Sequence, residues 1–307
     1  MYGKIVVVGS TNTDFVFTAA KFPAAGETVL GSGFNTTYGG KGANQAMAAR
    51  LLGANVVFIS AVGDDKIGID TKQYFNSMGI AADYIFVKDN CASGTACILV
   101  EENSGENMIV VAPGANAKLS PDDMVKAAPA FAEAGMVVLQ AEIPIETITW
   151  VIEYAARLNI PVLLNPAPMP ENGFSEQLLK HVNILTPNET EILALFPENN
   201  DIDEAARRLL DIGVETIIVT RGHLGSLCYT SGGRLTIPAH EVTAIDTVGA
   251  GDTFSAAVAA AIVEGKDLKS ALEFASIAAA LSTTRRGAQA AMPKREEVNA
   301  QMLITNL

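Results

Sequence analysis

The sequence predicts an α/β fold in which helices flank a doubly wound, mostly parallel sheet. Short runs rich in Val and Ile, such as KIVVV, VVFISAV and TIIVT, are typical of strands buried on both faces of a parallel sheet. Segments with polar starts and helical apolar periodicity alternate with these runs over most of the chain. Because its 307 residues are 49% hydrophobic, the chain can bury a large core, and we expect a single α/β domain over residues 1–307.

The expected helices follow the buried runs in chain order. They cover residues 42–53, 120–135, 144–159 and 201–213. Ser120, followed by Pro121 and with Asp123 three positions on, has the pattern of a capped helix start. A further alanine-rich helix is expected from Thr253 onward.

Two regions interrupt this alternation. Residues 14–38 are strand-like with Pro and Gly turns, and residues 94–112 have the pattern of a β-hairpin around a polar turn at 103–106. We expect these regions to form a small second sheet, inserted into the α/β unit, that acts as a lid over a pocket. A detached sheet also exposes an edge or face that favours covering by a second subunit, so we expect a homodimer through the lid.

Charge and composition exclude several classes of partner and location. The net charge of −13 disfavours nucleic acid and acidic membrane surfaces, which are bound through clustered Lys and Arg. The longest apolar stretch, residues 256–263, is far shorter than the ~20 residues of a membrane-spanning helix. Cys91, Cys97 and Cys228 have neither metal-ligand nor redox spacing. We therefore expect a soluble protein of the reducing cytoplasm.

The stretch DTVGAGDTF, residues 246–254, places small residues and a carboxylate at an expected helix start. The free backbone N–H groups there, left unobstructed by glycine, suit an anion. Asp252 has two interpretations: a helix-capping acid, or a general base beside an anion hole. The second combination is what phosphoryl transfer to a hydroxyl requires.

A second glycine-rich element, YGGKGAN at residues 38–44, has no Ser or Thr after Lys41, so it is no Walker P-loop. No GxGxxG follows the first strand either, which argues against a nicotinamide-dependent oxidoreductase. The element is either a tight turn before a buried helix or a bend that presents Lys41 and Asn44 to a polyhydroxy ligand.

The chain resembles the ribokinase and PfkB family of carbohydrate kinases over essentially its full length. The motifs that carry the resemblance are GSTNTD at 9–14, GGKGANQA at 39–46, TPNETE at 186–191 and DTVGAGDTF, with NPAP at 165–168 and TRRGAQ at 284–289 around them. The resemblance implies ATP-dependent phosphorylation of the primary 5-hydroxyl of D-ribose. Alternatives are a kinase for 2-deoxyribose, a ketohexose or a nucleoside, and a non-catalytic sugar or nucleotide sensor on the same fold.

The resemblance also implies roles for individual residues. Asp252 matches the catalytic base, and the backbone of Gly249, Ala250 and Gly251 matches the anion hole. The positions that match sugar-binding residues are Asn12, Asp14, Gly40, Lys41, Asn44 and Glu142. An Asn offers both a donor and an acceptor, so Asn12 favours ribose over a deoxy sugar.

The cofactors implied by the resemblance are ATP, Mg²⁺ and K⁺. Asn188 and Glu191 match the residues that organise Mg²⁺ and its waters, although TPNETE is equally typical of a helix start. The positions that match nucleotide contacts are Thr220, Gly222, Gly225, Gly251 and Ser276.

A monovalent-cation site is implied around Asp246, whose alternative role is a turn residue capping its own loop. The further ligands would be the carbonyls of Val248, Ser282, Arg285 and Gly287. Ala291 stands where many members of the family have a serine, so one hydroxyl ligand is lost and the strength of activation by K⁺ is left open.

Overall fold

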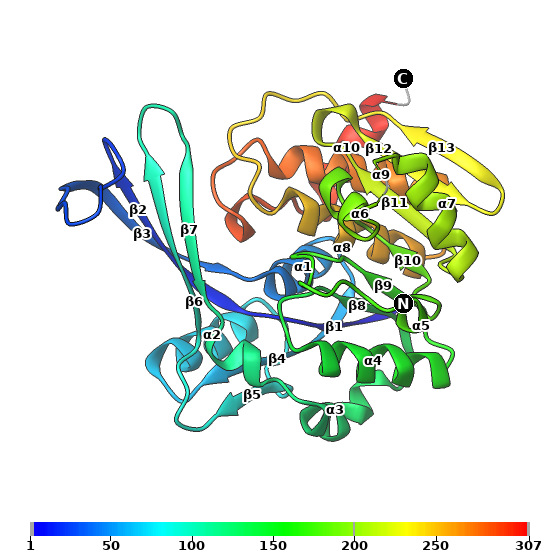
Figure 1. Ribbon diagram of the computed structural model, residues 1–307, viewed down its shortest axis with the longest axis horizontal. Helices are drawn as coiled ribbons and strands as arrows, with labels where there is room; N and C mark the ends of the chain where they lie inside the picture. Colours follow the sequence, from blue (N-terminus) through cyan, green and yellow to red (C-terminus); the bar gives the residue numbers. More distant parts are fainter. Residues whose placement is uncertain (1–2, 199, 306–307) are drawn as a thin grey trace.

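The computed structural model describes residues 3–198 and 200–305, and its main body is built on a nine-stranded sheet (Figure 1). The strand order is β13-β12-β11-β10-β9-β8-β1-β4-β5. All neighbouring pairs from β11 to β5 are parallel, and only β12 and β13 join antiparallel. The strands are β1 Lys4–Val8, β4 Asn55–Gly63, β5 Ile85–Lys88, β8 Ala134–Leu139, β9 Val162–Leu164, β10 Ile184–Leu185, β11 Thr216–Thr220, β12 Ser226–Thr230 and β13 Gly233–Ile237.

Helices cover both faces of this sheet, because the buried strands alternate their side chains between two cores. On β1, Ile5 and Val7 face the core under α1, α8 and α9, whereas Val6 and Val8 face the core under α3, α4 and α7. The helices are α1 Lys41–Leu51, α2 Lys66–Ser77, α3 Pro121–Ala127, α4 Ile145–Arg157, α5 Glu176–Leu179, α6 Glu189–Ala194, α7 Ile202–Ile212, α8 Ala250–Val263, α9 Leu268–Ser282 and α10 Arg295–Thr305. The predicted α/β class is thus confirmed.

A second, four-stranded sheet stands apart from the main body, at the left of Figure 1, with the order β3-β2-β6-β7. It is built from the two regions that interrupt the α/β alternation of the sequence. Its strands are β2 Asn12–Ala19, β3 Gly31–Gly39, β6 Gly94–Glu101 and β7 Asn107–Ala112. The small inserted sheet is therefore present, and its action as a lid stays a prediction.

Some elements differ from expectation. The helix expected over residues 120–135 starts at the predicted capping box of Ser120 and Asp123, but ends at Ala127 and continues as a 3₁₀ turn, Ala128–Phe131. Pro129 has no N–H to donate to the preceding turn, which explains the early end. The antiparallel hairpin β12–β13 and the helices α2 and α9 had no counterpart among the expected elements. No helix in the described part of the chain is both long and apolar enough to cross a membrane.

The order in which strands are added to the sheet reverses at β1, between β4 on one side and β8 on the other, although all three strands are parallel. From β1 the next main-sheet strands, β4 and β5, lie on one side, whereas β8 pairs with the other edge of β1. In open α/β sheets, ligands bind at the carboxyl ends of the strands where the order reverses. The loop after β1 leads into β2 and the loop after β8 carries Glu142, so both end at this switch point.

Candidate active site

A buried carboxylate lies at the centre of the site. Asp252 is in the first turn of α8 and is only 6% exposed. Its Oδ2 accepts a hydrogen bond from the Asn44 side chain at 2.9 Å, and its Oδ1 accepts one from Gln45 at 3.0 Å. Burial raises the pKa of Asp252, whereas Lys41 and the two amide donors lower it. The two donors, both on α1, fix the orientation of the carboxylate.

The N-terminus of α8 is open beside this carboxylate. Gly249 caps the helix in a left-handed conformation, with φ of 77°, and the helix begins at Ala250. A Cβ added to Gly251 would meet no atom within 4 Å, so space remains over the first turn. The N–H of Ala250 donates to the carbonyl of Thr247 at 3.2 Å. The predicted anion hole therefore has free space at Gly251, which suits a phosphoryl group at a helix N-terminus.

Two of the predicted sugar-binding residues lie on β2. Asn12 is buried, and its Oδ1 accepts a hydrogen bond from Asn116 at 2.8 Å, so its amide N–H₂ remains to face a ligand. Asp14 lies two residues on, facing the same side of the strand. Burial and repulsion from Glu142 raise the pKa of Asp14 to about 6. A Cβ on Gly39 would lie 2.1 Å from the carboxylate of Asp14, so only glycine leaves room for it there.

Glu142 ties the start of α1 to the loop after β1. Its Oε2 accepts hydrogen bonds from the hydroxyl of Ser10 and, at 2.9 Å, from the backbone N–H of Lys41. Gly40, the residue before the helix, has φ of 85°, and a Cβ there would lie 2.9 Å from the backbone nitrogen of Asn12. The predicted positions of the GGKGAN segment and of GSTNTD are thus in direct contact.

Asn188 and Glu191 cap α6 reciprocally. The Asn188 side chain accepts from the N–H of Glu191 at 2.8 Å, and Glu191 accepts from the N–H of Asn188 at 2.9 Å. The interpretation of TPNETE as a helix start is therefore correct, and the role of these two residues at Mg²⁺ stays a prediction. Burial raises the pKa of Glu191, and the charge of Asp252 acts in the same direction, whereas the N–H of Asn188 and the charge of Lys41 lower it. Thr220, at the end of β11, pairs with Asn188 through a β-bridge.

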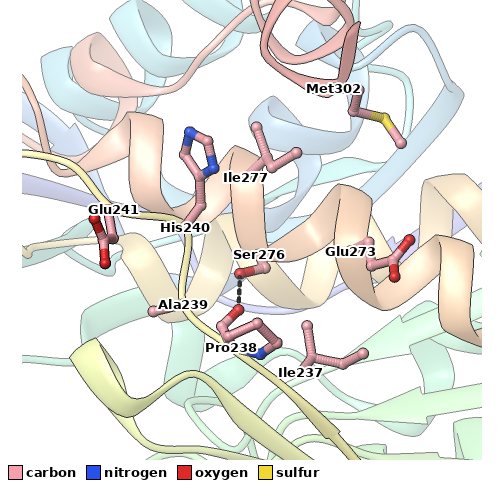
Figure 2. A pocket seen from close by; sticks show the side chains of 9 residues that line it. All are labelled: Ile237, Pro238, Ala239, His240, Glu241, Glu273, Ser276, Ile277 and Met302. Atoms are coloured by element: carbon pink, nitrogen blue, oxygen red, sulfur yellow. Dashed lines mark hydrogen bonds between the residues drawn. The ribbon is translucent and has the colours of Figure 1, made fainter. Parts of the chain in front are cut away.

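Gly222 and Gly225 form the turn between β11 and β12, both with positive φ. A Cβ on Gly225 would lie 2.1 Å from the carbonyl of Ile237, so this turn packs closely on the end of β13. Beyond it lies a pocket of about 510 Å³ between the segment after β13 and helix α9 (Figure 2). Ser276 lines this pocket and donates to the carbonyl of Pro238 at 3.0 Å. Its lining also includes His240, Glu273, Ile277 and Met302.

Asp246 joins two loops. Its Oδ1 accepts from the N–H of Val248 at 3.0 Å within its own turn, and its Oδ2 accepts from the N–H of Gly287 at 2.8 Å in the loop after α9. The turn-capping role of Asp246 is thus present, together with the link between loops. Ala291 is fully buried and brings no hydroxyl to this region. Within residues 3–198 and 200–305, no three His, Cys, Asp or Glu side chains could hold a metal ion together.

Residues 3–295 match the model of the pfkB family carbohydrate kinases. The chain belongs to the pfkB family of carbohydrate kinases. It is 43% identical to a ribokinase of Bacillus subtilis, over 96% of this chain and 98% of that protein. It is 38% identical to a deoxyribokinase of Salmonella typhi, over 96% of this chain and 97% of that protein.

Among solved structures, a ribokinase of Arabidopsis thaliana complexed with ribose and ATP superposes on this carbohydrate kinase with a TM-score of 0.88. The two chains are 32% identical, and the alignment covers 98% of each. The predicted fold class and the predicted class of enzyme, a sugar kinase of the pfkB family, are confirmed. The oxidoreductase alternative is set aside by the same finding.

Several polar residues of the kinase site were not singled out from the sequence. Gln45, Asn165 and Gln289 lie within the quoted motifs, but no role was assigned to them, and Asn116 lies outside those motifs. Gln45 donates to Asp252 and to Asn165, and in turn accepts from Gln140 at 2.7 Å. The available signal for Gln45 was its position beside Asn44 in an otherwise apolar helix, where an unpartnered amide would be costly, whereas Asn116, Asn165 and Gln289 lie in loops or 3₁₀ turns without such a signal.

Replacement of Asp14 by asparagine is expected to stabilise the folded chain at neutral pH. The carboxylate is ionised there in both states, but ionisation costs more in the folded state because the folded pKa is raised to about 6. The gain should reach about 3 kcal/mol at about pH 7.5 and should fade as the pH falls through 6 toward 4, where folded Asp14 is already protonated. Urea unfolding at several pH values measures it.

The matched control is Asp83→Asn, because Asp83 is exposed. A gain for Asp14→Asn that is independent of pH, or no larger than that of the control, would contradict the raised pKa.

Proposed function

We propose that this carbohydrate kinase transfers the γ-phosphoryl group of ATP to the 5-hydroxyl of D-ribose, with Asp252 as the general base. The observation that carries the proposal is the placement of Asp252: a buried carboxylate, held by two amide donors, beside the open N-terminus of α8. Asp252 takes the hydroxyl proton as the hydroxyl oxygen attacks, and ADP leaves on the far side of the phosphorus. Backbone N–H groups of Gly249, Ala250 and Gly251 stabilise the negative charge on the transferring group, and the N–H of Ala250 exchanges its turn bond to Thr247 for a phosphoryl oxygen.

The sugar lies between β2 and the start of α1 in this proposal. Asp14, with two acceptor oxygens, binds a pair of neighbouring hydroxyls, and the free amide of Asn12 donates to another. Lys41, Asn44 and Glu142 complete the pocket. Gly40 contributes through its backbone, because its positive φ lets the chain approach Asn12 closely.

ATP lies along the carboxyl ends of β10, β11 and β13. The pocket at Ser276 is large enough for an adenine ring, since small-molecule pockets measure about 300–1,000 Å³. The turn at Gly222 and Gly225 and the side chain of Thr220 border the phosphates. This assignment is supported by the solved ribokinase that contains ribose and ATP.

Mg²⁺ fits this site only as an ion that keeps most of its waters, because the described residues offer no cluster of three ligands. Asn188 and Glu191 would hold those waters, and the ion would neutralise charge on the phosphates. K⁺ would be held at Asp246 with the carbonyls of Val248, Ser282, Arg285 and Gly287. The fit rests on the two loops that Asp246 already joins by hydrogen bonds.

The second candidate substrate is 2-deoxyribose, favoured by the deoxyribokinase relative at 38% identity. Ribose is preferred here because Asn12 keeps an N–H₂ group directed away from its Asn116 partner, and this group would lose its acceptor if a sugar hydroxyl were missing.

The small sheet is proposed as a lid and as a dimer interface. Asp14 shares one face of the sheet with Ala96 and Val111, because these positions pair across β2, β6 and β7, so this face covers the site. The opposite face carries apolar side chains with no cover from the described chain. They are Phe17, 40% exposed, Phe34, 60%, Met108, 54%, and Val110, 72%. A second copy of the chain would bury this face.

Asp252→Asn is expected to lower kcat by about 10²–10⁴-fold while ribose still binds, because asparagine keeps the shape but cannot accept the proton. Turnover is measured by coupled ADP release, and ribose binding by calorimetry. Near-normal turnover would remove Asp252 from the role of base.

A panel of sugars assayed with Mg²⁺-ATP, with and without K⁺, tests the substrate and the cation site together. We expect kcat/KM for ribose to exceed that for 2-deoxyribose by about tenfold or more. K⁺ should raise turnover in the wild type and should not do so in Asp246→Ala. A preference for the deoxy sugar would show that 2-deoxyribose is the substrate. Turnover that does not change with K⁺ would contradict the role of Asp246 as a cation ligand.

Sedimentation is expected to give a particle of twice the 32.2 kDa chain mass. Val110→Glu should dissociate it, because the charge would be buried in the interface. Val125→Glu, on α3 and also well exposed at 60%, is the control and should remain dimeric. A wild-type monomer at micromolar concentration would rule out the dimer.

A further inference from the structure

Asp252 is the end of a hydrogen-bond chain that begins on α2. The hydroxyl of Tyr74 donates to Oε1 of Gln289 at 3.0 Å. Nε2 of Gln289 donates to Oδ1 of Asn44 at 3.1 Å, and Nδ2 of Asn44 donates to Oδ2 of Asp252 at 2.9 Å. Each residue comes from a different element: α2, the 3₁₀ turn Gln289–Ala291 (residue 289 onward), α1 and α8. Every link donates toward the carboxylate.

This direction is set by the ends of the chain. A carboxylate only accepts, so Asn44 must turn its N–H₂ group toward Asp252 and its oxygen away. That oxygen needs a donor, and Gln289 supplies it only if its own oxygen faces Tyr74. Tyr74 is a hydroxyl and can donate, so it terminates the chain. Reversal of either amide would set two oxygens against each other.

The hydrogen-bond chain is shielded from water, and its outer end at Tyr74 is held in place by packing. Asn44 is 6% exposed and Gln289 is 7% exposed, so water could not easily replace either amide if its hydrogen-bond partner were removed. The ring of Tyr74 stacks on that of Tyr38, at the end of β3, with centroids 3.9 Å apart. Gln289 lies two residues after Gly287, whose N–H binds Asp246. The chain thus links the small sheet and the loop after α9 to the carboxylate.

We propose that Gln289 and Tyr74 are positioning residues for the phosphoryl transfer: they hold the amide of Asn44 in the one orientation that donates to Asp252. The inference rests on the proposed role of Asp252 as base. The inference adds two residues, Gln289 and Tyr74, that do not contact the substrate. They keep Asp252 ionised and hold its carboxylate in one orientation. The hydrogen bond from Asn44 lowers the pKa of Asp252 against the effect of burial, in agreement with this role.

The ionisable groups that face this chain are few. Around Asp252 they are Lys41 on α1, Glu142 after β8 and Glu191 on α6. Asp14 on β2 is linked to this group through Glu142, and its pKa is raised to about 6 by burial and by the charge of Glu142. Around the outer end, Tyr38 faces Tyr74, and Asp70 and Lys66 of α2 act on Tyr38. Since the test variants below carry no titratable side chain at the replaced positions, a change in the pH profile reports on Asp252 and these unchanged neighbours.

The test uses Gln289→Met and Tyr74→Phe, which keep nearly the same shape and remove the donors. The acid limb of kcat/KM for the sugar should move to higher pH, by about half a unit to one unit in Gln289→Met and by less in Tyr74→Phe. At pH values on the acid limb, kcat/KM should therefore be about 3–10-fold lower than in the wild type, whereas the alkaline limb should not move. The double variant should match Gln289→Met alone, because both changes break one chain.

Tyr229→Phe is the matched control. It removes another largely buried phenol hydroxyl, which donates to Asp203 at 2.7 Å and lies on β12, next to the edge strand β13, and it should leave the pH profile unchanged. An unmoved acid limb in both test variants, or additive effects in the double variant, would overturn the proposal. If Gln289→Met fails to fold in a thermal melt, Tyr74→Phe alone decides through its acid limb.

A failure of the positioning role can be distinguished from a failure of Asp252 as the base. If Asp252→Asn is inactive and the acid limb does not respond to Gln289→Met, the base stands and the positioning role fails. If Asp252→Asn remains active, the base assignment fails, and with it the premise of the chain.

Discussion

The burial of one carboxylate, Asp252, is the constraint on which the rest of the site depends. An ionised group removed from water is costly unless donors replace the lost hydration. Here the donors are the side-chain amides of Asn44 and Gln45, neighbouring residues on α1. Their short side chains reach Asp252 only because α1 and α8 pack closely, and both helices present alanines to the shared core. The alanines of these two helices thus permit the close packing that brings both amides to the buried carboxylate.

The position of α1 is fixed at its other end by the switch point of the sheet. A Cβ on Gly42 would lie 2.6 Å from backbone atoms of Gly9 and Ser10, so the helix start touches the loop after β1. Glu142, from the loop after β8, closes this contact through Ser10 and the N–H of Lys41. The loops that follow the two strands at the reversal are thereby joined to the helix that orients the base. Glycine is needed at this position for contact, and not for flexibility.

The sequence predicts the alternation of strands and helices, the inserted small sheet and the start of α8, because each has a local signal: buried apolar runs, turn residues, and glycines before an alanine-rich helix. Pro129 shortened a helix whose capping box had been predicted correctly. The partners of Asp252 could not be derived from local pattern, because Asn44 lies 208 residues from Asp252 in the chain, and Gln289, which orients Asn44, lies 245 residues from Asn44. Periodicity reports which face of a helix is buried, but it does not report which distant amide pairs with which carboxylate. The family resemblance supplied positions for the sugar, nucleotide and cation residues, and their individual roles remain predictions.

The distribution of charge explains why such a site needs a directional network. In a chain whose net charge is −13, the charge of Glu142 raises the pKa of Asp14 and of Asp252, and the charge of Asp252 raises that of Glu191, whereas Lys41 lowers the pKa of both Glu191 and Asp252. Negative charge beside a carboxylate raises its pKa, so a base surrounded by acids tends to become protonated and lose its function. An incoming triphosphate would increase this tendency. Neutral amide donors oppose the protonation of Asp252 without adding a second positive charge, which would attract the phosphates away from α8. Because only the N–H₂ end of an amide can donate to the carboxylate, the chemistry requires each amide to have the correct orientation as well as to be present.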